Sequence, residues 1–302
     1  MKFRAQLTAA LLLAGCATTP AAPPAPDTVA LKFAPHAGSA RIESVDVRTT
    51  RAAGREQVRR LVMHATSTVL EVPEGYAIVN EDVSFESPVP NPLLDLAAKI
   101  AEGFRLVVNR EGEIVELHGL EDLQPSMMQW FGGLQHGAVP PAVLEQMRNT
   151  ILQATDPRVI AEKTAADWFQ QVGVWNGKTL EIGRTYEGPA PDSYRYRAIE
   201  RLPCRAGETE DRCVRLELVS RPPEEQLRRA AEAMGPLLRQ LGPDTTHGPL
   251  EIDDRVELVV EPDTLDAHWM EEKRIVRMSV TSGAETASIE RDEVETTTWK
   301  YE

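Results

Sequence analysis

Hydrophobic and polar residues alternate along much of the chain, the pattern of strands that bury one face. It is clearest over residues 250–261, where apolar side chains occupy every second position and charged ones stand between them. Short turn signals separate many such segments, which favours antiparallel neighbours. The pattern predicts strands at 41–50, 57–72, 76–86, 104–109, 113–118, 179–187, 193–203, 213–221, 250–261, 267–281 and 285–300.

Helical spacing of apolar residues interrupts the strands at four places. Asn91-Pro92, Pro141 and Asp156-Pro157 each precede such a segment, and Asp-Pro is a good N-cap and first-turn pair. The strongest is 223–241, where one apolar stripe ends at Gly242. These elements predict an α+β fold, a curved antiparallel sheet or incomplete β-barrel with several helices packed on its concave face.

The order of elements is similar in the two halves of the body, with strands, a helix begun by proline, and more strands. Two similar halves, about 38–175 and 176–302, are consistent with a duplication or with chance similarity of amphipathic hairpins. Neither half contains a linker rich in Gly or Ser. We therefore expect one continuous domain over residues 38–302.

The N-terminal residues differ from the body. Residues 1–15 join a cationic start, Lys2 and Arg4, to an apolar stretch that is too short to span a bilayer, which is typical of a signal peptide. Residues 16–37 begin with a Pro/Ala-rich stretch and are predicted to form a tether.

The run Leu13-Ala14-Gly15-Cys16 resembles the lipobox of bacterial lipoproteins. The resemblance implies a mature protein that begins at Cys16, carries acyl chains there and is anchored in a membrane. Ala17, in place of Asp, implies the outer membrane, with the body in the periplasm. An ordinary secreted protein with a cysteine in its cleavage site is the alternative.

The amino-acid composition limits the classes of molecule that the protein can bind. Acidic residues number 47 against 33 basic ones, for a formal charge of −14. So acidic a surface repels phosphate backbones and anionic headgroups, which makes nucleic acid an unsuitable partner.

Cys204 and Cys213 form an even pair in an oxidising compartment and flank a polar loop. They are predicted to form a disulfide that closes a hairpin. Thiol redox chemistry would favour closer spacing, and structural zinc would favour a nearby histidine pair. We predict no metal and no cofactor.

Motifs for catalysis are missing from the sequence. No two of the six histidines lie three or four residues apart, and there is no nucleophile elbow or phosphate-binding loop. Because carboxylates far apart in sequence can still converge, a hydrolase with dispersed catalytic residues stays an alternative.

The segment 123–134 gathers Met127, Met128, Trp130 and Phe131 before Gly132-Gly133. Methionine adapts to irregular surfaces and paired glycines permit hinging, so these four side chains are candidate ligand contacts on a flap over an apolar cavity. The alternative is a short helix packed permanently on the core.

The expected architecture is similar to the general plan of periplasmic lipoprotein carriers and receptors, an unclosed antiparallel barrel with a helical lid. This resemblance implies a non-enzymatic, lipid-anchored envelope protein that binds an apolar ligand or an envelope protein. A purely structural assembly factor of the envelope is a third alternative, beside the hydrolase.

Overall fold

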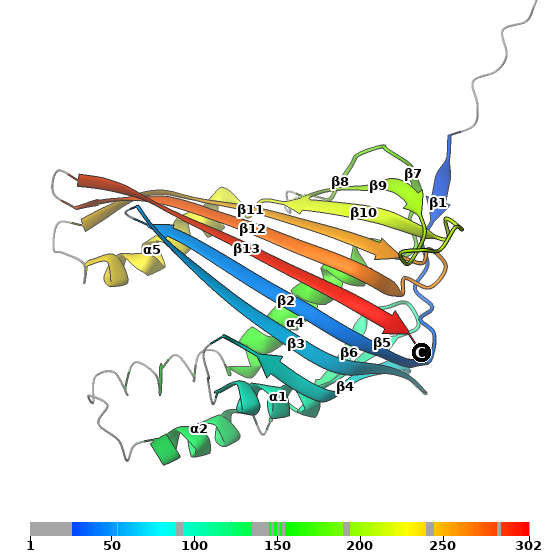
Figure 1. The fold of residues 1–302 in the computed structure, drawn as a ribbon, viewed down its shortest axis with the longest axis horizontal. Coiled ribbons are helices and arrows are strands. Elements are labelled where there is room, and N and C mark those ends of the chain that lie inside the picture. The colour runs from blue at the N-terminus through cyan, green and yellow to red at the C-terminus, as the bar shows by residue number, and fades with distance from the viewer. Residues whose placement is uncertain are drawn as a thin grey trace, which may run out of the picture.

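The protein is mostly β-structure. A computed structural model describes residues 26–301 with the exception of 53, 89–92, 122, 135–144, 146–147, 150–151, 153–154, 190–193, 240–244 and 283–284. Within this part, one 11-stranded antiparallel sheet forms the body, and a two-stranded sheet, β1 with β7, lies beside it (Figure 1).

The large sheet has the strand order β6-β5-β4-β3-β2-β13-β12-β11-β10-β9-β8. Its long central strands run side by side along the molecule (Figure 1). The strands are β1 (Thr28–Ala30), β2 (Gly38–Ala52), β3 (Arg55–Val72), β4 (Gly75–Glu86), β5 (Arg105–Asn109), β6 (Ile114–His118), β7 (Thr179–Glu181), β8 (Tyr186–Glu187), β9 (Tyr194–Leu202), β10 (Cys213–Ser220), β11 (Thr245–Val260), β12 (Ala267–Ser282) and β13 (Glu285–Tyr301).

The helices of the described residues are α1 (Leu93–Gly103), α2 (Leu123–Leu134), α4 (Pro157–Trp168) and α5 (Glu224–Arg239), and a π-helical turn, η1 (Phe169–Gly173), continues α4. Helix α4 begins as predicted, with Asp156 accepting a hydrogen bond from the Arg158 amide and proline in the first turn. Helix α1 packs on β4 and α5 packs on β11.

The predicted α+β class, with several helices packed on a concave face, is wrong. Periodicity located α1, α4 and α5, but it does not show how strands and helices divide between layers. The strands β2, β3, β11, β12 and β13 are each 15 to 18 residues long, and they dominate the body. Typical strands have about five or six residues. The helices α1 and α5 each cover mainly one strand, so they form no continuous layer.

Several predicted segments differ in detail. The predicted strand 179–187 is divided into β7 and β8, because Gly183 between them takes a positive φ of 82°. Residues 28–35, expected within the tether, contain β1 and the core side chains of Leu31 and Phe33. The helix expected from Pro141 lies largely outside the described residues.

The halves of the body occupy two sides of one sheet. Strands β2 to β6 form one side, β8 to β13 form the other, and β2 pairs with β13 where they join. Helix α1 connects the adjacent strands β4 and β5, and α5 connects the adjacent strands β10 and β11. This arrangement is compatible with duplication, which stays a prediction.

The main core lies at the end of the sheet where β13 finishes. Trp175, Leu180, Leu216 and Leu258 are fully buried there, against the N-terminal residues Leu31 and Phe33. Antiparallel partners point to the same side of a sheet. We call the side that carries Leu258, Met270, Thr297, Ser44 and Met63, which are successive partners across the strands, the inner face.

Candidate functional site

A cavity of about 430 Å3 separates the inner face from α4 and η1. Its floor comes from β2, β3, β4, β5, β12 and β13, and its cover comes from the helix. Apolar side chains form much of the lining, with polar ones at intervals, as is common in sites for small apolar ligands. The apolar residues include Phe33, Ile42, Met63, Leu106, Trp168, Val172, Met270 and Trp299.

Aromatic packing holds the cover in place. The Phe33 ring meets the rings of Tyr76 and Trp168 edge to face, each at a centroid distance of 5.6 Å. The indole N–H of Trp168 donates to the Gly112 carbonyl at 2.7 Å. The end of α4 is thereby tied both to the N-terminal segment and to the β5–β6 hairpin.

A short hydrogen-bond chain crosses the floor of the cavity. The Thr297 hydroxyl donates to the Ser44 oxygen at 3.1 Å, and the Ser44 hydroxyl donates to a Glu295 carboxylate oxygen at 2.8 Å. Both hydroxyl residues are buried, and the chain gives each of them a partner. It also fixes the orientation of the Glu295 side chain at the cavity wall.

Carboxylates converge where the floor meets α4. Glu272, Glu295 and Asp46 are successive cross-strand partners, so three acidic side chains lie in one row of the inner face. Asp167 reaches this region from α4, and it lines the cavity together with Glu295.

The surroundings of these carboxylates change their pKa values. Burial raises the pKa of Asp167, and the charge of Glu295 acts in the same direction against the opposing effects of Lys163 and Arg274. Burial likewise raises the pKa of Glu272, with Arg274 opposing the shift. Raised carboxyl pKa values in a cavity are a feature that acid–base catalysts share with structural charge clusters.

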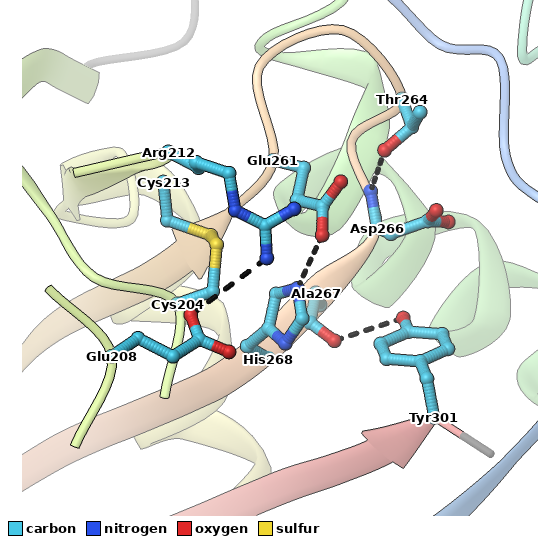
Figure 2. Close-up of a disulfide and its surroundings, with 10 residues drawn as sticks. All are labelled: Cys204, Glu208, Arg212, Cys213, Glu261, Thr264, Asp266, Ala267, His268 and Tyr301. Carbon is cyan, nitrogen blue, oxygen red and sulfur yellow. Dashed lines mark hydrogen bonds and ion pairs between the residues drawn. A yellow bond between two sulfur atoms is a disulfide. The ribbon is translucent and has the colours of Figure 1, made fainter. Parts of the chain in front are cut away.

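The predicted disulfide between Cys204 and Cys213 is present (Figure 2). The bond closes the base of the loop that joins β9 to β10, and it packs with Val259 in a small buried cluster. Beside it, His268 is buried and shares a hydrogen bond of 3.0 Å between its Nε2 and the Glu261 carboxylate.

A smaller hollow of about 280 Å3 lies next to the disulfide, lined by His268, Glu208 and Arg212 among others. Gly38, Asp266 and Tyr301 line this hollow and the larger cavity. The Tyr301 hydroxyl donates to the Ala267 carbonyl at 2.9 Å (Figure 2), and burial raises the pKa of this phenol.

One group of potential metal ligands occurs among the described residues. The sulfur atoms of Cys204 and Cys213 and a ring nitrogen of His268 lie within 4.8 Å of one another. Cysteine binds zinc as a thiolate, and these two sulfurs are bonded to each other. The group could therefore hold a metal only after reduction. The position of His268 beside this pair could not be predicted from the sequence, because His268 belongs to β12, which is remote from both cysteines in the chain.

The candidate flap residues are in α2. Phe131 is buried, with 1% of its surface exposed, and Met127 and Met128 are half-buried. The side chain of Trp130 is outside the described part of the structure. Met127, Met128 and Phe131 do not line the cavity beneath α4, so contact of the candidate residues with a ligand stays a prediction.

The residues that do line the cavity were not singled out from the sequence. The alternation along each strand places Ile42, Met63 or Trp299 on one face, but it cannot show which faces meet. Trp168 lies in the helix predicted after Asp156-Pro157, but helical spacing does not show what this helix faces. Cys16, the predicted site of lipidation, lies outside the described residues.

Within the described part of the chain, no helix combines the length and the apolar character needed to cross a bilayer. A scan against models of known protein families gives no match for this chain, and a search of curated proteins gives none either.

Proposed function

We propose that this protein is a lipid-anchored protein of the bacterial envelope that binds an apolar ligand between its inner face and α4. The observation that supports the proposal best is the apolar cavity of about 430 Å3 under the helix. An apolar chain would contact Trp168 from above and Trp299 and Met63 from the sheet. Burial of apolar surface provides about 25 cal/mol for each Å2 removed from water.

The anchor is the N-terminal cysteine of the mature chain. Support comes from the lipobox-like run that ends at Cys16 and from the Pro/Ala-rich residues that follow it. Strand β1 begins at Thr28, so 12 residues, Cys16 to Asp27, precede the fold. Fully extended, they would reach about 40 Å, enough to hold the body off the headgroups.

Fluorescence quenching tests the ligand site. Fatty acids that carry bromine on the chain should quench tryptophan in the full-length protein, because Trp168 and Trp299 line the cavity. The double variant Trp168→Phe/Trp299→Phe should lose most of the quenching. Trp269 is the matched control, because it belongs to the cluster around the disulfide. The Trp269→Phe variant should keep the quenching.

Two results would count against the ligand site. The first is a wild-type protein that is not quenched at any concentration of monomeric fatty acid. The second is a double variant that is quenched as strongly as the wild type. Either one would leave the cavity without an apolar ligand.

The anchor has a test of its own. Native cells that express the protein should incorporate labelled palmitate into it, and the Cys16→Ser variant should carry no label. Label that persists in this variant, or a purified protein that retains Met1, would refute the lipidation.

A second candidate function is hydrolysis, and the carboxylates of the cavity favour it. Asp167 and Glu295 line one hollow, and the pKa of Asp167 is raised. Such a pair can divide the roles of acid and base. If the protein is a hydrolase, Asp167→Asn abolishes turnover of glycoside or ester substrates, whereas in a binding protein the quenching by brominated fatty acid persists in this variant.

A further inference from the structure

A second hollow, of about 530 Å3, lies on the same side of the sheet. Four arginines, Arg48, Arg59, Arg60 and Arg291, contribute to its wall, and we call it the arginine hollow. Among the described residues that line it, only Asp46 is acidic. In a protein with a formal charge of −14, this is a local reversal of charge.

Strand register explains how the arginines come together. Asp254, Arg274, Glu293, Arg48 and Arg59 are successive cross-strand partners from β11 to β3. The sign of the charge alternates along this row until its last step, where Arg48 on β2 lies directly opposite Arg59 on β3. Like charges in direct opposition destabilise a sheet. The row therefore ends in an unfavourable pair that an anion would stabilise.

Nearby carboxylates neutralise only part of this charge. Arg48 donates to Asp46 at 2.8 Å, and Arg291 pairs with Glu293. Arg59 and Arg60 form no ion pair with any residue that the structure describes. Because an arginine presents several N–H groups in a plane, two or more of them can hold a phosphate through paired hydrogen bonds.

Protection of a strand edge accounts for some of these charges but not for all of them. Strand β3 extends beyond β4, whose described pairing starts at Val62, and charged residues on an exposed edge discourage aggregation. This explains Arg55 and Arg60 on β3. Arg48 is different, because β2 is paired on both sides, with β3 and with β13.

The arginine hollow lies next to the apolar cavity along β3. Met63 lines the cavity, Leu61 lines the hollow, and Arg59 follows on the same face of β3. Successive side chains on one face of a strand are about 7 Å apart. An apolar path thus leads from the space under α4 to the guanidinium groups, beside the acidic row.

We propose that the arginine hollow binds the phosphate of an amphiphile whose acyl chain occupies the cavity under α4. The inference rests on the proposed function and gives its ligand a chemical class, a lipid with an anionic phosphate headgroup. Arg59 and Arg48 bind the phosphate, and Leu61 and Met63 contact the first part of the chain.

Binding of three probes to the full-length protein tests this proposal. The probes are dioctanoyl phosphatidic acid, dioctanoylglycerol, which lacks the phosphate, and inorganic phosphate, which lacks the chains. Phosphatidic acid should bind at least about tenfold more tightly than dioctanoylglycerol, because each charge-assisted hydrogen bond contributes about a factor of ten. Inorganic phosphate should bind much more weakly than either lipid.

Arg59→Gln should remove the preference for phosphatidic acid and leave the affinity for dioctanoylglycerol unchanged. Added salt should weaken phosphatidic acid binding to the wild type more than to this variant. Arg55→Gln is the matched control. Arg55 is on the same strand and face, opposite Ala52, and does not line the hollow, so the preference should persist.

The outcomes separate this inference from the proposed function. Equal affinity for both lipids, or an Arg59→Gln variant that keeps the preference, overturns the inference and leaves an apolar site intact. If inorganic phosphate binds as tightly as phosphatidic acid, the hollow is a site for free anions and the inference is also wrong. If neither lipid binds, the proposed function fails with it.

Discussion

The two ends of the inner face differ although one set of strands builds both. Where β13 finishes, side chains from the sheet, the N-terminal segment and η1 fill the space, and Trp175 and Leu258 have no exposed surface. At the opposite end of the same strands, Arg59 and Arg291 line an open hollow. The backbone ladder is similar at both ends, so the covering segments and the charge of the side chains make the difference.

Replacement of Trp175 by Ala should have the largest effect on stability. Its side chain is fully buried, its indole N–H donates to the Gln170 carbonyl at 2.7 Å, and its ring packs against Tyr196. Loss of a buried aromatic side chain typically costs about 3–5 kcal/mol. Urea unfolding of the variant and the wild type would measure this loss in the free energy of unfolding. Phe169→Ala, at a ring that is 40% exposed, is the control and should cost clearly less.

Removal of the disulfide should have the next largest effect. The Cys204→Ser/Cys213→Ser variant should lose about 2–3 kcal/mol, since the bond closes a short loop, with a sequence separation of 9. Addition of a reductant should reproduce this loss in the wild type and change nothing in the variant. Equal stability of the two proteins would show that the hairpin needs no cross-link.

The carboxylates between the two ends should make stability depend on pH. The pKa of Asp167 is raised in the folded protein, so its ionisation opposes folding at neutral pH. Asp167→Asn should therefore unfold at higher urea than the wild type at pH 7. The difference should shrink as the pH falls through the raised pKa toward the ordinary value of about 4, because the wild-type carboxyl then gains its proton.

The smallest effect on stability is expected in the arginine hollow. Arg59 is exposed and forms no ion pair with a described residue, so Arg59→Gln should change the free energy of unfolding by no more than about 0.5 kcal/mol. A small gain would agree with relief of the opposition between Arg48 and Arg59. A loss of several kcal/mol would show that the arginines serve the fold and not a ligand.

Local pattern was sufficient to locate most strands. The alternation over 250–261 corresponds to β11, and the turn at Arg110-Glu111-Gly112 corresponds to the β5–β6 hairpin. The alternation of Val29, Leu31 and Phe33 was also in the sequence, but the prolines before it led to its assignment as tether. The three side chains are in fact buried in the main core.

What the sequence could not provide is the register between distant strands. Arg48 and Arg59 are on one predicted hairpin, whereas Glu293 reaches the same row from the far end of the chain. The Trp168 ring contacts the Phe33 ring only because the N-terminal segment packs against the end of α4 in the folded protein. Such contacts depend on how whole faces pack, which the period of a single segment does not encode.

The pairing of β2 with β13 has a consequence for how the protein folds. It pairs Ala40–Ala52 with Ile289–Tyr301, so the two sides of the sheet are joined only when β13 is present. Contacts of such wide separation slow folding, since long loops must close before they form. A nascent chain that does not yet contain β13 therefore lacks its central pairing, and a polypeptide without this strand would be left with two half-sheets.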